Sequence, residues 1–349
     1  MTSFNLQCPV PLRHDTIQLS HGGGGRHMRE LIESVFLAVF DPEGRGLRHD
    51  SAVVECEAGK LALTTDSYVV NPLFFPGGNI GCLAVYGTVN DLAMAGATPL
   101  WLSAGFVLEE GLPIAELRRV VESMQRAARS AGVQIVTGDT KVVERGKGDG
   151  IYINTAGVGR VPPGVDVCPR RVTAGDQLLL SGDLGRHGVA VMSVREDLGF
   201  SADLRSDVAS LAEVAGALAL ELGQDLHCLR DLTRGGLSSA LNELALDAGV
   251  DFEIREAALS TCDAVAGACE ILGLDPLAVA CEGRFVAVVP PGRAAAALAI
   301  MRAHDPAAAL IGRVVELSAG RPGRVVVESD LGGRRILELL AGEQLPRIC

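Results

Sequence analysis

The chain has 349 residues, of which 48% are hydrophobic and 21% charged, a composition typical of a globular protein with about two domains. Its formal charge of −12 argues against binding to nucleic acid or to an anionic membrane, because like charges repel. Nine scattered cysteines without a Cys-x-x-Cys pair, and no basic-then-apolar signal segment, predict a cytoplasmic protein with neither a disulfide framework nor a zinc site.

The N-terminal region places a glycine loop before a helix. Residues 1–15 contain two prolines and no periodicity, which predicts a flexible arm, and a short strand follows over 16–19. The run Gly22, Gly23, Gly24 and Gly25 then leads into a helical apolar pattern over 28–40. Such a loop can present backbone N–H groups to a phosphate, although it does not match the Walker pattern and can equally be a hinge.

Apolar segments of the first half carry conspicuous polar residues. Strands over 52–56 and 61–65 are predicted to turn at 58–59, and the second runs into Asp66. After a turn over 76–81, an apolar helix contains Asn90 and Asp91, which either line a buried site or lie at its solvent edge. A strand over 99–108 and a helix from Pro113 precede a strand over 133–137, and a strand over 151–161 carries Asn154. The polar cluster predicted at the end of strand 133–137 comprises Gly138, Asp139, Thr140, Lys141 and Glu144.

Residues 161–176, with three prolines and two glycines, mark the predicted boundary between domains over 16–165 and 166–335. The second half is predicted to hold a strand over 177–181, a helix from Ser206 to about 222, and Asp231 before a helix that ends at 248. Strands over 252–254 and 285–289 follow, with Glu282 in the turn before the second. A helix over 293–303 and strands over 309–315 and 324–328 complete this domain.

The last predicted segment is a mobile tail over 336–349 that carries Cys349, whose thiol can be passed between sites. Carboxylates that converge in one cleft repel each other unless a cation lies among them, and Mg²⁺ with nucleotide phosphates suits such oxygen ligands. Each polar residue can also belong to an ordinary surface ion pair. The residues that could converge in this way are Asp66, Asn90, Asp91, Asp139, Lys141, Glu144, Asp231 and Glu282.

Several motifs resemble the ATP-binding family of aminoimidazole ribonucleotide synthetase and selenophosphate synthetase. The phrase 73–78 (Leu-Phe-Phe-Pro-Gly-Gly), the glycine loop and the final Pro-Arg-Ile-Cys narrow the resemblance to the HypE family of hydrogenase maturation proteins. It covers the chain from about residue 17, with Gly23 where a serine is expected in the loop. The wider family motifs lie at 64–68 (TTDSY), 76–81 (PGGNIG), 89–93 (VNDLA), 138–143 (GDTKVV), 230–236 (RDLTRGG) and 282–283 (EG).

The resemblance implies a mechanism in which a partner, HypF, loads a carbamoyl group onto the sulfur of Cys349. ATP then drives loss of water from this group to give a thiocyanate, and the cyano group passes to iron on a HypC–HypD complex. Lys141 would stabilise charge on the transferring phosphoryl group or the amide oxygen, and Glu282 would take a proton from the carbamoyl nitrogen. The implied Mg²⁺ ligands are Asp66, Asp91 and Asp139, and the implied ATP-binding residues add Gly22 to Gly25, Asn90, Thr140, Asn154 and Asp231.

The same resemblance implies an α/β fold of two PurM-like domains, whose N-terminal domains pair their sheets into a barrel across a homodimer. Two other functions stay open at this point. A small-molecule synthetase of the same superfamily would not need Cys349. A scaffold that only presents a thiol to HypC–HypD would not need Lys141 or the aspartates.

Overall fold

The computed structural model describes residues 25–31, 33, 52–56, 59–196, 204–317, 322–329 and 331–339. The predicted arm 1–15, the strand 16–19, Gly22 to Gly24 and Cys349 lie outside these residues. Within the predicted helix 28–40, the described helix is α1 (Arg26–Leu31). None of the helices in the described part of the chain has the length and apolar character that a membrane crossing requires.

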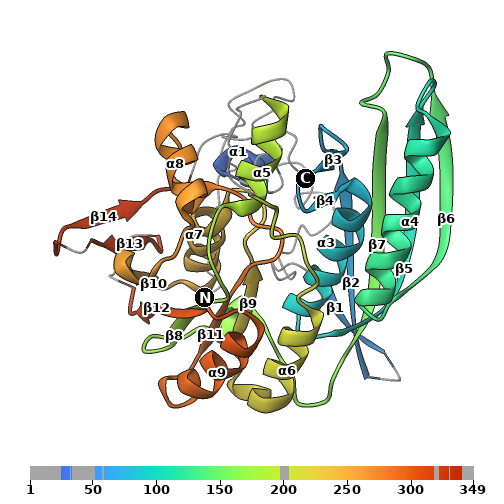
Figure 1. Cartoon of the computed structure of the whole chain (residues 1–349). Coiled ribbons are helices and arrows are strands. Elements are labelled where there is room, and N and C mark those ends of the chain that lie inside the picture. Colours follow the sequence, from blue (N-terminus) through green and yellow to red (C-terminus); the bar gives the residue numbers. More distant parts are fainter. Residues whose placement is uncertain are drawn as a thin grey trace, which may run out of the picture.

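The N-terminal domain is built on a five-stranded sheet with the order β1-β2-β7-β5-β6 (Figure 1). Only β5 and β6 run parallel; the other neighbours are antiparallel. In β7 the odd-numbered residues from Ile151 to Val161 are buried and the even-numbered ones are more exposed, so one face of the sheet forms the core. The strands are β1 (Ala52–Cys56), β2 (Gly59–Tyr68), β5 (Thr98–Glu109), β6 (Gln134–Val143) and β7 (Ile151–Val161), and the helices are α3 (Ile80–Met94) and α4 (Ile114–Ser130).

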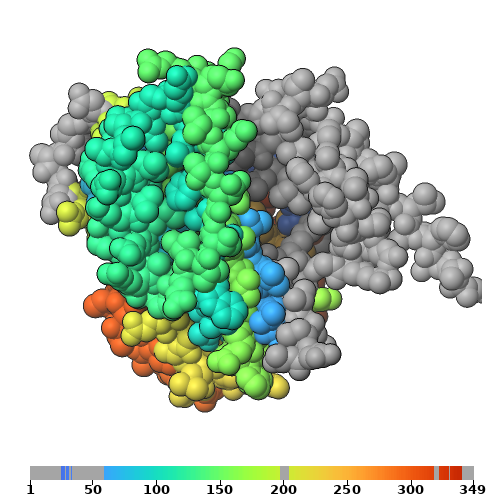
Figure 2. Space-filling view, turned by 90° about the vertical axis from the view of Figure 1, so that its right-hand side faces the viewer, coloured from blue at the N-terminus to red at the C-terminus, as the bar shows by residue number. Residues whose placement is uncertain are grey.

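The opposite face of this sheet is open. Figure 2 shows this side of the molecule, with residues of the N-terminal domain in light blue, teal and green at the surface. Trp101, Leu63 and Val107 are exposed large hydrophobic residues there, at 48%, 40% and 37%. An exposed apolar sheet face of this kind is typical of an interaction surface.

The C-terminal domain is built on a mixed seven-stranded sheet with the order β14-β13-β10-β12-β8-β11-β9. Leu179, Phe285 and Ala287 pack with α6 and α9 on one face, whereas Leu178, Val286 and Val288 pack with α7 on the other. The strands are β8 (Gln177–Leu180), β9 (Cys228–Asp231), β10 (Asp251–Arg255), β11 (Phe285–Val289), β12 (Ala309–Val315), β13 (Val325–Glu328) and β14 (Arg334–Leu337). The helices are α5 (Arg186–Arg195), α6 (Ala212–Leu222), α7 (Gly236–Ala248), α8 (Asp263–Leu272) and α9 (Ala294–His304).

Helix α3 joins the two domains. It packs on β2 and β7 of its own domain and also contacts α6 and β9 of the other (Figure 1). A short hairpin of β3 (Phe74–Phe75) and β4 (Gly78–Asn79) precedes it, and the Asn79 side chain accepts hydrogen bonds from the backbone N–H groups of Gly81 and Cys82. The core cluster around α3 includes Val189 and Val265 of the C-terminal domain, so the domains share buried apolar surface.

The mixed α/β class and most predicted elements are confirmed, with four differences. Strand β6 ends at Val143 and not at 137, so the predicted polar cluster, apart from Glu144, lies within a strand. Helix α6 begins at Ala212 and not at Ser206, because residues 206–211 bond to other segments of the chain. Helix α8 and strand β14 were not predicted, and β14 places Leu337 in the core at the beginning of the predicted tail.

Candidate active site between the two domains

Two of the predicted carboxylates meet on the helix-covered face of the N-terminal sheet. Asp66 of β2 accepts a hydrogen bond of 2.9 Å from the hydroxyl of Thr88, and Asp91 of α3 accepts one of 2.7 Å from Thr64. Thr64 and Asp66 share a face because they lie two residues apart on one strand. Burial raises the pKa of Asp66, while Thr88 and, at longer range, Arg234 lower it.

Asp231 brings a third carboxylate to this cluster from the C-terminal domain. It ends β9, is 7% exposed, and pairs with Phe285 of β11 in the sheet. Burial and the nearby Asp66 raise its pKa to about 6, against the opposing effects of Arg230 and Arg234. Because the charge of Asp66 helps to raise the pKa of Asp231, these two carboxylates, which come from different domains, lie near each other in what is here called the acidic cluster.

Glu282 is the most deeply buried acid of the acidic cluster. It lies in the turn before β11 and is 3% exposed, and its Oε1 atom makes no hydrogen bond within the described residues. Burial raises its pKa well above the ordinary value, and the charges of Asp231 and Asp207 add to this effect. A buried carboxylate without a partner at one oxygen is costly, so its presence indicates a chemical role.

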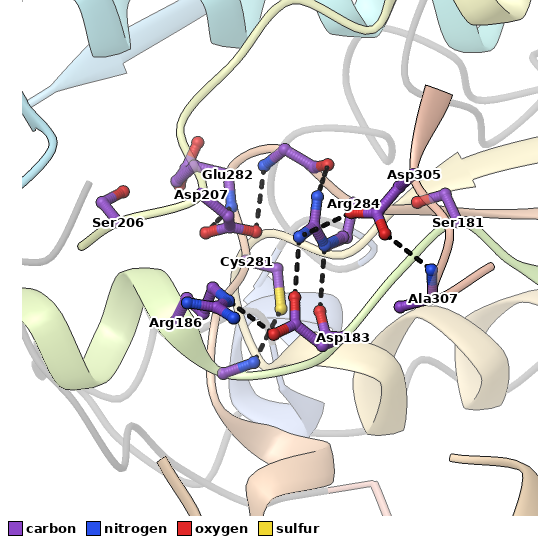
Figure 3. A network of polar contacts seen from close by, with 12 residues as sticks. Ser181, Asp183, Arg186, Ser206, Asp207, Cys281, Glu282, Arg284, Asp305 and Ala307 are labelled. Atoms are coloured by element: carbon purple, nitrogen blue, oxygen red, sulfur yellow. Dashed lines mark hydrogen bonds and ion pairs between the residues drawn. The ribbon is translucent and has the colours of Figure 1, made fainter. Parts of the chain in front are cut away.

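The backbone around Glu282 is held rigidly (Figure 3). The N–H of Cys281 donates to the carbonyl of Leu232 at 2.9 Å. The Arg284 guanidinium forms ion pairs of 2.7 Å with Asp183 and 3.1 Å with Asp305. The turn is therefore fixed on both sides of Glu282, a geometry that preorganises a reactive group.

The Arg284 ion pairs give a stability prediction. Arg284→Ala is expected to lower the free energy of unfolding by about 2 kcal/mol, because the buried Asp183 would keep only Arg186 as its cation and the partly buried Asp305 would lose its ion pair. Urea denaturation followed by circular dichroism measures this change. The control is Arg313→Ala, which removes an exposed ion pair with Glu253 and should cost less than about 0.5 kcal/mol. Equal losses in the two variants would contradict the prediction.

The side chain of Asn90, which was predicted to bind the nucleotide, forms hydrogen bonds with backbone groups from the second half of the chain. Its Oδ1 accepts from the N–H of Leu211 at 2.7 Å, and its Nδ2 donates to the carbonyl of Ala209 at 3.0 Å. A longer contact of 3.4 Å joins Nδ2 to the carbonyl of Glu282. The two neighbours thus differ, because the buried Asn90 connects the domains whereas the half-buried Asp91 accepts a hydrogen bond from Thr64.

Asp139, Lys141 and Asn154 lie on the open face of the N-terminal sheet, away from Asp66. The strand register sets Ser67, Asn154, Gly105 and Asp139 in one row across β2, β7, β5 and β6. This row is one residue out of step with Asp66, which places its side chains on the other face. A shallow cavity of about 350 Å³ lies there, lined in part by Asp139, Lys141 and Asn154, and Thr140 points away because it neighbours Asp139 on the strand.

The three predicted metal ligands therefore do not come together in a single chain. Asp66 and Asp91 are close, whereas Asp139 is separated from them by the thickness of the sheet. Among the described residues, no group of three histidine, cysteine or acidic side chains is arranged to hold a metal ion. Strand parity places Asp139 on the other face of the sheet from Asp66 within one chain, and the Asp66–Asp91–Asp139 set stays a prediction that would need residues of two chains.

The described end of the predicted glycine loop is anchored on the C-terminal domain. Gly25 is buried and immediately precedes α1. Within α1, Arg29 forms an ion pair of 2.8 Å with Asp247 of α7. Burial lowers the pKa of Arg29, but the charges of Asp247 and Glu33 and their hydrogen bonds with Arg29 raise it above its ordinary value. Helix α1 thus contacts α7 of the C-terminal domain, while α3 of the N-terminal domain contacts β9.

Two charged residues beside the acidic cluster were not predicted as site residues. Arg234 lowers the pKa of Asp66, Asp231 and Glu282 alike, so its positive charge faces acids from both domains. Its position within the 230–236 motif was a usable signal. Asp207, which contacts the Glu282 turn, had no such signal because it belongs to no quoted motif.

Comparisons with known proteins agree with this architecture. Residues 48–161 match the model of the AIR synthase related protein N-terminal domain, and residues 173–322 match that of its C-terminal domain. A protein of Azotobacter vinelandii, described as carbamoyl dehydratase HypE, is 51% identical over 342 residues, which cover 97% of this chain and 99% of that protein.

Two solved structures are similar over nearly their whole length. One is a crystal structure of a HypE–HypF complex, whose matching chain has a TM-score of 0.83 and 45% identity, covering 89% of this chain and 99% of that one. The other is a crystal structure of the hydrogenase maturation protein HypE in complex with ATP, with a TM-score of 0.81 and 49% identity. It covers 96% of this chain and 100% of that one.

Proposed function

Since the chain belongs to the HypE carbamoyl dehydratases of the AIR synthase related family, we propose that it uses ATP to dehydrate a carbamoyl group on its own Cys349. The product is a thiocyanate on the same sulfur, which supplies the cyanide ligands of the [NiFe]-hydrogenase iron centre. The observation that carries the proposal is Glu282, a buried carboxylate beside three further acids from two domains, with one oxygen that accepts no hydrogen bond from the described part of the chain.

The reaction divides into two steps with balanced atoms. The amide oxygen of the S-carbamoyl group attacks the γ-phosphorus of ATP, and ADP leaves while the nitrogen loses one proton. The remaining N–H proton then passes to the Glu282 carboxylate as the C–O bond breaks, phosphate leaves and the C≡N bond forms. Burial suits this role because it raises the pKa of Glu282, which makes its carboxylate a stronger base.

Mg²⁺ fits the carboxylates of Asp66 and Asp91 by their chemistry. Both supply the hard oxygen ligands that this ion prefers, and a cation would offset the burial that raises the pKa of Asp66. When bound, Mg²⁺ would neutralise charge on the nucleotide phosphates. Asp231 and the predicted glycine loop Gly22 to Gly25 are proposed to contact the nucleotide, and the related HypE structure was solved in complex with ATP.

The proposed partners are HypF, HypC–HypD and a second copy of the chain. HypF is present with the related chain in the HypE–HypF complex. The open sheet face, with its exposed Trp101, Leu63 and Val107, supports a homodimer in which two such faces pair. Lys141, Asp139 and Asn154 on this face would then lie at the interface and contribute to the partner's site.

An intact-mass experiment tests the function. The chain is incubated with HypF and carbamoyl phosphate, and then with ATP. We expect the gain of one carbamoyl group followed, only with ATP, by the loss of one water, and neither change in Cys349→Ala. Undiminished ATP turnover in Cys349→Ala would instead identify a small-molecule synthetase. A carbamoyl group that never loses water would leave only a scaffold.

A further inference from the structure

Residues 206–211, here called the strap, cross between the domains without regular secondary structure. Both ends of the strap are bonded to the N-terminal domain. The N–H of Ser206 donates to the carbonyl of Pro76 at 2.9 Å, and the N–H of Leu211 donates to Oδ1 of Asn90 at 2.7 Å. The strap thus belongs in sequence to the second half of the chain but is positioned by the first.

Within the strap, Asp207 binds the turn that carries Glu282. Asp207 Oδ1 accepts a hydrogen bond of 3.2 Å from the N–H of Glu282, and Oδ2 accepts one of 3.3 Å from the N–H of Gly283 (Figure 3). A Cβ atom at Gly283 would lie 2.0 Å from the carbonyl oxygen of Asp207, so only glycine permits this approach. The two segments are therefore in direct contact through both side chain and backbone.

The choice of an acid for this contact has an electrostatic cost. An asparagine or serine would cap the turn by the same kind of hydrogen bond without adding a negative charge beside Glu282. Asp207 instead raises the pKa of Glu282, together with burial and Asp231. A carboxylate accepts two backbone N–H groups at once, which fixes the turn more tightly than a neutral cap with one acceptor oxygen.

We propose that Asp207 is a positioning residue, which holds the Glu282 carboxylate in register with Asp66 and Asp91 across the domain boundary. Because the strap is bonded to both, the N-terminal domain fixes the position of Glu282, the base on the C-terminal domain. This inference rests on the function proposed above, in which Glu282 takes the proton from the carbamoyl nitrogen.

The test uses the full chain, loaded beforehand with the carbamoyl group by HypF. In a single turnover with ATP, Asp207→Ala is expected to lower the rate constant of dehydration about 100-fold, because small displacements of a catalytic group are that costly. The ATP concentration that gives half-maximal rate should change by less than about twofold, since both carboxylate oxygens of Asp207 are engaged by the backbone of Glu282 and Gly283. Asp207→Asn keeps one acceptor and should recover to within about tenfold of the wild-type rate.

Two comparisons separate positioning from general stability. Asp275 caps another turn of the same domain by accepting from the N–H of Leu277 at 2.9 Å, so Asp275→Ala should keep the wild-type rate. In the background of Glu282→Gln, Asp207→Ala should have no further effect, because a residue that acts through another loses its effect with it. Additive losses in the double variant, or a wild-type rate in Asp207→Ala, would overturn the inference.

The failure of this inference is distinguishable from that of the proposed function. If the wild-type chain gains the carbamoyl group but never loses water, the function itself is wrong. If the wild-type chain dehydrates and Glu282→Gln does not, while Asp207→Ala matches the wild type, then only the positioning role is wrong.

Discussion

Replacing Glu282 by glutamine is expected to slow thiocyanate formation about 10³-fold, with no effect on carbamoyl loading of Cys349. Glutamine has nearly the same shape but cannot accept the proton of the carbamoyl nitrogen. The substitution also removes a carboxylate whose pKa burial raises, so it should stabilise the fold at neutral pH. A loss of rate therefore cannot be attributed to unfolding.

The same variant tests how the dehydration rate depends on pH. Since Glu282 acts as a base only when ionised, and its pKa lies well above the ordinary value, the wild-type rate should rise with pH through that elevated pKa. The residual rate of Glu282→Gln should lack this rise. The rates come from intact-mass measurements on preloaded chain at timed intervals after addition of ATP.

A matched control is Glu253→Gln, which changes a half-buried glutamate of the same domain whose carboxylate pairs with Arg313 at 2.8 Å. It should keep the wild-type rate and pH profile. If Glu282→Gln dehydrates within about threefold of the wild type, the assignment of Glu282 as proton acceptor is wrong.

The sequence indicated the residues of the acidic cluster because each lies next to or at the end of an apolar segment. Asp66 follows apolar residues of its strand, Asp231 ends β9, and Glu282 precedes the fully buried β11. Such positions are visible without a structure, since polar residues inside apolar patterns need a reason. The acids come together from two domains because α3 packs against β9. No local sequence pattern predicts this packing.

The face of the sheet was the main feature that sequence could not supply. Asp139 and Lys141 were expected at a strand end, where any direction is possible, but β6 continues through them and fixes their side. The polar composition of β6 hid its length, because the strand is exposed along almost all of its residues. Asp207 was missed for a different reason: its role exists only through tertiary contacts with Glu282 and Gly283.

The division of the polar residues between two faces leads to a prediction about the proposed homodimer. Asp66→Asn and Lys141→Ala should each lower the dehydration rate at least about 100-fold, because Asp66 is proposed to act at the nucleotide and Lys141 is proposed to stabilise the transferring charge. Within one chain, Asp66 faces α3 and Lys141 faces the open side, so the sheet separates them. The two residues can serve one reaction only if they come from different protomers.

A mixture of the two variants, unfolded and refolded together, is therefore expected to recover about a quarter of the wild-type rate. Random pairing makes half of the dimers mixed, and each mixed dimer has one site with both residues intact. As a control, a chain with both substitutions is mixed equally with wild-type chain. Shared sites predict about a quarter of the activity from that mixture, whereas sites within one chain predict about half. No recovery in the first mixture, together with half activity in the second, would place Asp66 and Lys141 in the same protomer's site and refute the shared interface.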